Sequence, residues 1–323
     1  MRRRAGLALA LAALSFAPIS APVRAAAPSP AEARALLAER QGVDQRLQDI
    51  GWKLATANAR YCADAQPSVG LSLHDMANYG DPAAVRQLLG MQRDIAVLAA
   101  AAGSPAALAG LGVNEEIAAI DETDPNDWPS APANDWRRAV RAHDWIDDRL
   151  AARGRITLAL ADGREVTLVP EPACPTRFEM GGPGKRALAE GQRVIVERDF
   201  PALAYAEDEL AAAIAHELAH NLLRHRAWLD AQGRKQAHVR LTEREADRLM
   251  PWLLANAGYD PAAAARFMAQ WGPRHSGGVF RKRSHDGWDE RAEIITTEVA
   301  LVKQIWAARG AADWATGFRR ETP

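Results

Sequence analysis

The sequence has few cysteines, no surplus of charge of either sign and, after its first residues, no long apolar run. Its 40 basic and 41 acidic side chains nearly balance over 323 residues. That balance argues against a dedicated nucleic-acid binder, which needs excess positive charge against phosphate. We expect no membrane span in the mature chain, because a spanning helix needs about 20 apolar residues. Glycine (23) and proline (19) occur at ordinary frequencies, which excludes a collagen-like or wholly disordered chain and leaves a soluble globular protein.

The first 27 residues have the pattern of a secretory signal peptide. Arginines at positions 2–4 precede an uninterrupted apolar run over 5–14, and Ala25-Ala26-Ala27 closes the segment with small residues. The apolar run breaks at Ser15 and Pro18, so it is too short to be a membrane anchor. We expect cleavage near Ala27 and export to the periplasm or the medium. No cysteine lies at the cleavage site, which argues against a lipoprotein.

The only two cysteines, Cys62 and Cys174, are 112 residues apart. Export delivers the chain to an oxidising compartment, where two cysteines can pair. A disulfide closing so long a loop would stabilise the fold by about 4–5 kcal/mol if it acts through chain entropy. We therefore predict a disulfide, the alternative being two separate buried thiols.

Helical spacing of apolar residues predicts one long helix over residues 29–60, with Pro30 in its first turn. We accordingly interpret residues 28–88 as an N-terminal helical segment. A helix of this length serves as a packing brace or as an oligomer contact. The sequence does not decide between the two, and the oligomeric state stays open.

Residues 89–175 have the pattern of a β-rich domain. Strands are predicted over 94–98 and 113–120, and a hairpin over 155–169 turns at Asp162-Gly163. An amphipathic helix over 135–153 interrupts this pattern.

The β-rich segment resembles a PDZ-like domain. The resemblance depends on Gly103-Ser104-Pro105-Ala106-Ala107, on Ala109-Gly110-Leu111 and on the closing hairpin, with Asn114-Glu115 where the family usually has Gly-Asp. It implies a groove that binds an extended peptide by strand addition. A rigid structural module is the other interpretation.

A helix predicted over residues 206–229 contains His216-Glu217-Leu218-Ala219-His220, an HExxH pattern. Because an α-helix turns by about 100° per residue, this spacing brings both imidazoles onto one face, where they can bind one metal ion. Glu217 lies beside the first histidine, where it can act on a water molecule. The alternative is two satisfied histidines on a helix surface, but Ile214 and Leu222 make the surroundings apolar, as expected beneath a cleft.

A catalytic zinc needs a third protein ligand and keeps a fourth position open. The metzincin pattern is excluded, because Leu223 and Arg226 occupy the positions where it has glycine and histidine. We expect His225 behind the ligands or at the surface, because it lies on a different helix face. A carboxylate from a following helix, giving a His2Glu site, is the remaining choice.

A helix predicted over 238–250, stopped or kinked by Pro251, offers that carboxylate. Glu243 and Asp247 are one turn apart and share a face. Glu243 is therefore a candidate metal ligand, and Asp247 a candidate hydrogen-bond partner of a ligand or reacting group. Taken alone, these residues describe an exposed acidic face neutralised by neighbouring arginines, but beside the HExxH pattern we prefer the metal site.

Together these motifs resemble the M48 family of zinc metallopeptidases. His216–His220 matches the family's HExxH, and Glu243-Arg244-Glu245-Ala246-Asp247 matches its ExEAD. Residues 284–291 are similar to its SHPxxxxR, with Asp286 in place of proline. The resemblance covers residues 185–308 and implies a mostly helical zincin-type (gluzincin) protease domain at 176–323. The expected fold is α+β, with a long helix and a PDZ-like β domain before the protease domain.

The resemblance also implies the chemistry of a metalloendopeptidase acting on protein or peptide substrates. One Zn2+ would be bound by His216, His220 and Glu243, with Glu217 as catalytic base and Asp247 as supporting acid. Two further residues come from the third motif: His285, a candidate donor to the oxyanion, and Arg291, which would brace its loop or pair with Asp247. For His285, an inhibitory fourth zinc ligand and a surface residue remain alternatives.

A binding module of another class competes with the enzyme. In that interpretation the PDZ-like domain and a zinc-stabilised helical platform hold exported clients, in the manner of a chaperone, without cutting them. The open metal position would then have to be blocked. A metal-dependent hydrolase of non-peptide amides is a third option.

Overall fold

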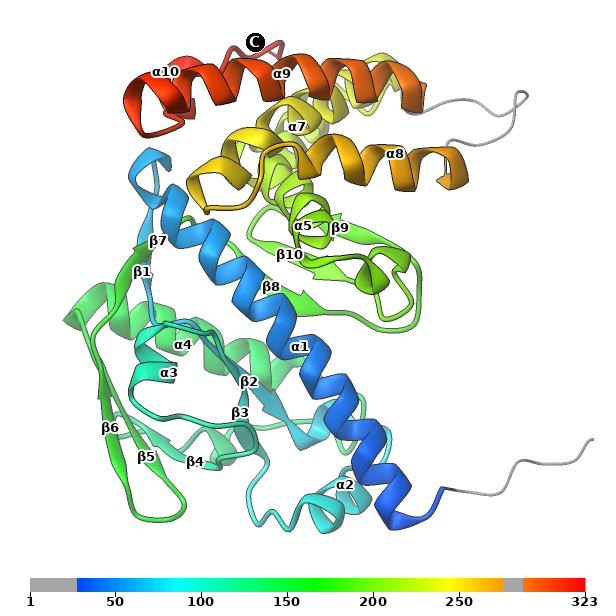
Figure 1. The fold of residues 1–323 in the computed structure, drawn as a ribbon. Helices are drawn as coiled ribbons and strands as arrows, with labels where there is room; N and C mark the ends of the chain where they lie inside the picture. Colours follow the sequence, from blue (N-terminus) through cyan, green and yellow to red (C-terminus); the bar gives the residue numbers. More distant parts are fainter. Residues whose placement is uncertain (1–27, 276–286, 323) are drawn as a thin grey trace, which may run out of the picture.

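The computed structural model describes residues 28–275 and 287–322, which form a mixed α+β fold (Figure 1). The predicted α+β class is therefore confirmed. The predicted signal peptide at 1–27 and His285 lie outside the described residues. In the described part of the chain, no helix combines the length and the apolar character needed to cross a membrane.

The long helix α1 (Pro30–Asn58) begins with a complete capping arrangement. Ser29 accepts a hydrogen bond from the Glu32 amide, and the Glu32 carboxylate accepts one from the Ser29 amide at 2.7 Å. Pro30 occupies the first turn, where its missing N–H costs nothing. The predicted helix over 29–60 is thus confirmed, its last residues forming a short 3-10 turn at Ala59–Tyr61.

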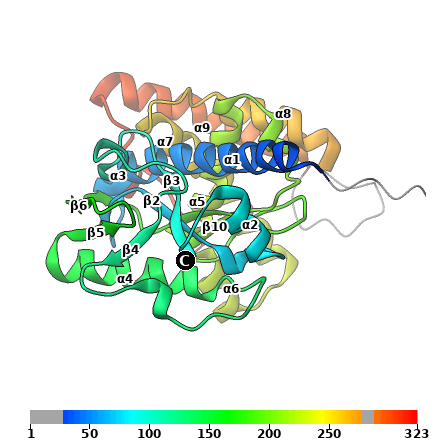
Figure 2. The same ribbon diagram turned by 90° about the horizontal axis from the view of Figure 1, so that it is seen from below.

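Helix α1 lies between a β-rich part and a helical part of the molecule, and contacts both (Figures 1 and 2). Towards the β-rich part, the Gln45 amide donates to the Ala100 carbonyl at 2.8 Å. Towards the helical part, the Arg46 guanidinium donates to the Leu203 carbonyl at 2.9 Å. Of the two roles predicted for this helix, the structure therefore displays that of a packing brace.

The β-rich part consists of short sheets around a main apolar core and a smaller separate cluster formed by Met76, Met91 and Ala96. Its elements are β1 (Gln66–Ser68), β2 (Leu71–Asp75), α2 (Pro82–Leu89), β3 (Ile95–Ala100), α3 (Pro105–Leu108), β4 (Ile117–Ile120), α4 (Arg137–Arg153), β5 (Ile156–Leu160), β6 (Glu165–Leu168) and β7 (Glu171–Ala173). The strands pair antiparallel as β1-β7, β2-β3 and β4-β5-β6. The predicted hairpin and the helix between the strands are confirmed.

Two local predictions in this part need correction. The segment 28–88 is not only helical, because β1 and β2 lie within it and pair with strands of the following segment. These strands have three and five residues, too few for a clear alternating pattern. The strand predicted over 113–120 begins only at Ile117, because Asn114 adopts a left-handed conformation with φ of 67°.

The helical part contains a three-stranded sheet, on which one helix packs, and further helices that pack on that helix and on one another. Its elements are β8 (Arg177–Met180), β9 (Ala187–Ala189), β10 (Arg193–Val196), α5 (Glu207–Leu222), α6 (His225–Gln232), α7 (Gln236–Asn256), α8 (Ala263–His275), α9 (Trp288–Arg309) and α10 (Trp314–Gly317). The strand order is β8-β10-β9, with β10 parallel to β8 and antiparallel to β9. Helix α5 packs on α7, α8 and this sheet, which places it at the centre of the larger apolar core.

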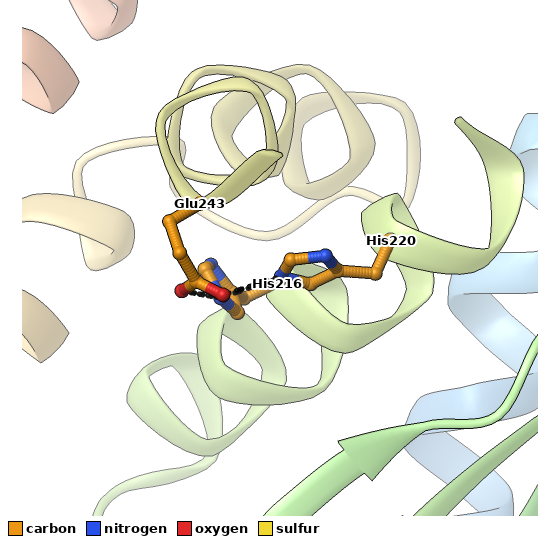
Figure 3. A group of neighbouring side chains, drawn as sticks. All are labelled: His216, His220 and Glu243. Carbon is orange, nitrogen blue, oxygen red and sulfur yellow. Dashed lines mark hydrogen bonds and ion pairs between the residues drawn. The ribbon is translucent and has the colours of Figure 1, made fainter. Parts of the chain in front are cut away.

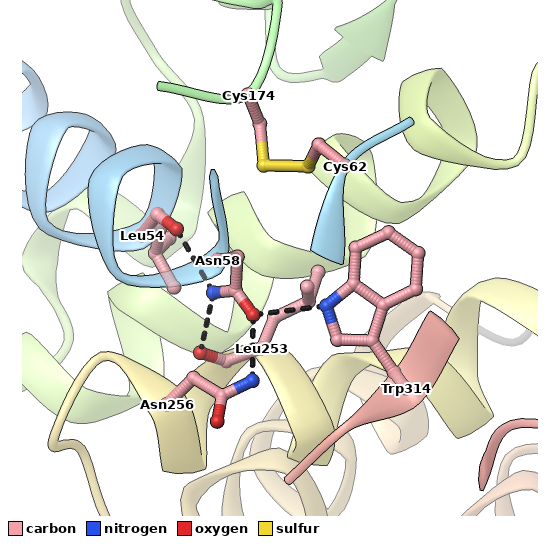
Figure 4. The surroundings of a disulfide bond; sticks show 7 residues. All are labelled: Leu54, Asn58, Cys62, Cys174, Leu253, Asn256 and Trp314. Atoms are coloured by element: carbon pink, nitrogen blue, oxygen red, sulfur yellow. Dashed lines mark hydrogen bonds between the residues drawn. A yellow bond between two sulfur atoms is a disulfide. The ribbon is translucent and has the colours of Figure 1, made fainter. Parts of the chain in front are cut away.

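The disulfide predicted between Cys62 and Cys174 is present, and it fixes the chain after α1 to the chain after β7 (Figure 4). Next to it, the fully buried Asn58 connects three distant elements. Its amide donates to the Leu253 carbonyl at 3.1 Å, and its Oδ1 accepts from the Trp314 indole at 3.0 Å and from Asn256 at 2.9 Å. The end of α1 is thereby anchored to α7 and α10, and α7 is one of the two helices that carry the candidate site.

Candidate metal centre

Helix α5 carries the HExxH motif and is buried on nearly every side. Its first turn contains three acidic residues, Glu207, Asp208 and Glu209. Their negative charges interact favourably with the positive N-terminal end of the helix dipole. The predicted extension to residue 229 is wrong, because the helix ends at Leu222 and Arg224 turns the chain with φ of 54°. The sequence has no glycine at this position to indicate the end of the helix, because an arginine adopts the left-handed conformation.

Helix α7 carries the candidate carboxylates and is longer than predicted. It runs from Gln236 to Asn256 and continues through Pro251. A proline inside a helix costs about 3 kcal/mol. Here Leu249, Met250, Trp252 and Leu253 are fully buried around it, and burying side chains of this size contributes about 1.5–3 kcal/mol each. Packing therefore outweighs the local cost, and of the two effects predicted for Pro251, a stop or a kink, the stop is not found.

The structure brings His216 and His220 of α5 together with Glu243 of α7 (Figure 3). The two Nε2 atoms lie 3.2 Å apart. The Glu243 carboxylate approaches both rings, with Oε2 at 3.4 Å from His216 Nε2 and Oε1 at 3.5 Å from His220 Nε2. These are the three residues that the sequence indicated as metal ligands.

The donor atoms fit a tetrahedral divalent cation. Zinc binds imidazole nitrogen and carboxylate oxygen at about 2.0–2.2 Å, so ligand atoms at tetrahedral corners lie about 3.3–3.6 Å from one another. The two Nε2 atoms, 3.2 Å apart, lie close to that edge length, and the carboxylate reaches one ring at 3.4 Å and the other at 3.5 Å through its two different oxygens. Two imidazoles and one carboxylate are the His2Glu set of catalytic zinc sites.

The candidate site is reachable from solvent, although its supports are buried. The side chains of His216, His220 and Glu243 are 11%, 13% and 17% exposed. Asp247, one turn along α7 from Glu243, is only 1% exposed. Structural zinc sites are closed by four protein ligands, whereas catalytic ones keep an open position. Among the described residues, only three side chains form this cluster.

Asp247 supports His216 from the side opposite the cluster. Its Oδ1 lies 3.1 Å from His216 Nδ1, an ion-pair contact that is not a well-aligned hydrogen bond. Arg291 of α9 donates two hydrogen bonds, of 2.6 and 2.7 Å, to the same carboxylate. Burial acts to raise the pKa of Asp247, but the contacts with Arg291 and His216 together outweigh it and lower the pKa, so the acid stays ionised. Of the two roles predicted for Arg291, the pairing with Asp247 is found.

His225 supports His220 in a corresponding way. It begins α6, is 1% exposed, and its Nδ1 lies 2.9 Å from the Nδ1 of His220. Its other nitrogen lies 2.9 Å from Oε2 of Glu245, a fully buried acid of α7. His225 is therefore behind the ligands, one of the two positions predicted for it.

Without a metal, the two histidines of the motif differ in their affinity for protons. Burial alone would lower the pKa of His216, but contacts with Asp247 and Glu243 outweigh it and raise the pKa to about 10. Burial lowers the pKa of His220 to about 3. Since a metal ligand must be deprotonated, binding of a cation here has to displace the proton from His216.

Glu217 is buried next to His216 and is not one of the three clustered ligands. Its main perturbation is burial, which raises its pKa to about 7, and the backbone of Ala189 in β9 is among the groups that counteract this rise. A carboxylate with a pKa near neutrality can both take and return a proton at working pH. Glu217 is thus placed beside the cluster as a candidate acid–base group.

Sequence reasoning missed two features of this site. Glu245 was noted only as part of a motif, and nothing indicated that Arg320, Glu321 and Thr322 would reach it. The sequence carries no local signal for a contact between residues 77 positions apart. His285 lies outside the described residues, so its predicted roles stay predictions.

Comparisons with known proteins add no assignment to this geometry. No protein-family model matches the chain. A search of curated proteins also finds no significant match.

Proposed function

We propose that this protein is a zinc-dependent metalloendopeptidase of the M48, gluzincin type, which hydrolyses peptide bonds of exported proteins. The observation that carries the proposal is the convergence of His216 and His220 with Glu243, whose donor atoms approach one another within 3.2 to 3.5 Å in a partly exposed cluster. Asp247 behind one histidine and His225 behind the other add the supports that metal-ligating imidazoles require.

In this proposal each residue has a separate task. A zinc ion held by His216, His220 and Glu243 would supply a Lewis acid to polarise the scissile carbonyl and lower the pKa of water towards about 7. Glu217 accepts the proton of the attacking water and delivers it to the nitrogen of the leaving amine. Asp247 and Arg291 hold the ring of His216 in place through their buried ion pair. His285 stays the candidate for stabilising charge on the carbonyl oxygen.

An extended peptide is the substrate shape that fits the surroundings. Strand β9 lies at one end of the order β8-β10-β9, so in the described residues its outer side has no strand partner. It packs against α5, and its Ala189 lies beside Glu217. A peptide added along this edge would form backbone hydrogen bonds and pass the candidate base.

The proposal also includes export of the chain and a PDZ-like domain. Export is supported by the disulfide between Cys62 and Cys174, since such bonds persist in oxidising compartments. For the PDZ-like interpretation, the support is local. Gly103 has φ of 77°, Ser104 caps α3 by accepting from the Ala107 amide at 3.2 Å, and Pro105 begins that helix. The quoted motif thus describes one turn and one capped helix, and a role in presenting substrates is part of the proposal.

The proposal is tested by protein cleavage under metal control. We expect the purified mature protein to cut casein or a quenched fluorescent peptide, a chelator to abolish cleavage, and added zinc to restore it. Cleavage that persists after complete removal of metal would contradict the metal mechanism. Tight peptide binding with no cleavage in the zinc-loaded protein would favour the non-catalytic, chaperone-like module instead.

A further inference from the structure

We propose that Glu245, held by the segment Arg320–Thr322, orients His220 as a metal ligand through a hydrogen-bond relay that passes through His225. This inference rests on the proposed metal site and extends it to residues that do not touch the metal. Glu245 and His225 are positioning residues in this scheme. The segment 320–322 becomes part of the metal centre although it is 100 residues beyond His220 in sequence.

The relay has two short steps. From His220 Nδ1 to His225 Nδ1 the distance is 2.9 Å, and from His225 Nε2 to Glu245 Oε2 it is again 2.9 Å. His225 is 1% exposed and Glu245 fully buried, so no bulk water competes for these contacts. A buried hydrogen bond in such surroundings holds its partners more firmly than a surface one.

Chemistry fixes the direction of both hydrogen bonds. An ionised carboxylate only accepts, so Nε2 of His225 must donate to Glu245. The Nδ1 of a neutral His225 is then an acceptor, and it receives the Nδ1–H of His220. That leaves the lone pair of His220 on Nε2, the atom that lies 3.2 Å from His216 Nε2 and 3.5 Å from Glu243. The opposite tautomer would place a proton on the metal side and prevent binding.

The carboxylate of Glu245 is itself fixed by several donors. Besides His225, these are the amide and hydroxyl of Thr322, both at 2.8 Å, the Arg320 guanidinium at 3.0 Å and the Glu321 amide. An acid so surrounded stays an acceptor and has one orientation.

Arg320 also fastens the turn that places His225. Its guanidinium donates to the Leu223 carbonyl at 3.2 Å. Leu223 precedes Arg224, the left-handed residue between α5 and α6, and His225 follows directly. The same segment therefore fixes both ends of the contact between His225 and Glu245.

The test compares zinc affinity, by competition with a chromogenic chelator, in full-length mature variants. Loss of an outer partner of a metal-ligating histidine typically weakens metal binding about 10–100-fold. We expect a loss of that size in Glu245→Gln and in His225→Phe. The matched control is Glu298→Gln, because Glu298 is a buried acid of α9 that accepts from Arg248 and Trp252. It should lose stability in the same way and keep wild-type zinc affinity.

Two further variants separate a relay from a merely structural role. His225→Gln supplies one donor and one acceptor, so it should recover part of the affinity lost in His225→Phe. The double variant Glu245→Gln/His225→Phe should bind no more weakly than His225→Phe alone, because Glu245 acts through His225. Cobalt-loaded samples give an independent readout, since their visible spectrum reports distortion of the ligand set.

Three results would each overturn the relay. The first is wild-type zinc affinity in folded Glu245→Gln, and the second is fully additive losses in the double variant. The third is equal zinc affinity in His225→Gln and His225→Phe. Circular dichroism of the metal-free proteins establishes which variants are folded. If a variant is not folded, Thr322→Val replaces it, because this substitution removes only one donor to Glu245. In it we expect a smaller loss of affinity than in Glu245→Gln, and an unchanged affinity would count against the relay. A wild-type protein that binds zinc but cleaves nothing contradicts the proposed function and leaves this comparison valid.

Discussion

Replacing Glu217 by glutamine is expected to lower kcat by about 10²–10⁴-fold, the usual contribution of a general acid–base group. Glutamine has nearly the same shape but cannot take the proton of water or return it to the leaving amine. Glu217 is not one of the three clustered ligands, so the variant should keep one zinc per chain. Peptide cleavage and metal content, measured on the same preparation, test both expectations.

A control for this variant is available on the same helix. Glu209 lies two turns earlier on α5, where it accepts a hydrogen bond of 2.6 Å from Arg266. Glu209→Gln should keep wild-type cleavage. A zinc-loaded Glu217→Gln variant that cleaves at the wild-type rate would refute the assignment of Glu217 as the base.

Replacing Glu243 by alanine is expected to abolish both zinc retention and cleavage. The variant keeps two imidazoles and loses the only carboxylate of the cluster. We therefore expect the zinc affinity to fall by more than the 10–100-fold that is typical when an outer partner is removed. Bound metal after dialysis and the dissociation constant for zinc measure this loss directly.

A second substitution at position 243 is expected to give an intermediate zinc affinity. Glu243→Gln keeps an oxygen donor without its charge, so it should bind zinc more weakly than wild type and more tightly than Glu243→Ala. If Glu243→Ala retained one zinc at wild-type affinity, the third ligand would have to come from elsewhere in the chain. The geometry of α5 and α7 would then have been misinterpreted.

Local patterns in the sequence predicted those parts of the site that depend on helix periodicity. The spacing of His216 and His220, and that of Glu243 and Asp247, follows from 3.6 residues per turn. That the two helices meet is confirmed by separations of 3.4 and 3.5 Å between Glu243 and the rings. Helix α1 was predictable for the same reason, since its apolar residues repeat over 29 residues.

Features decided by distant contacts could not be predicted. Helix α7 continues through Pro251 because buried side chains on both sides of the proline offset its cost. The strands β1 and β2 depend on partners at 171–173 and 95–100, not on a pattern of their own. Likewise, Thr322 reaches Glu245 only after the chain has passed through α8 and α9.

The most direct test of the account is the X-ray absorption spectrum of the zinc-loaded wild-type protein. We predict a four-coordinate zinc with two imidazole nitrogens and two oxygens, one from Glu243 and one from solvent, at about 2.0–2.2 Å and with no sulfur. A third imidazole in the spectrum would indicate a closed, non-catalytic site. A chain that binds no zinc at all would contradict the metal centre itself.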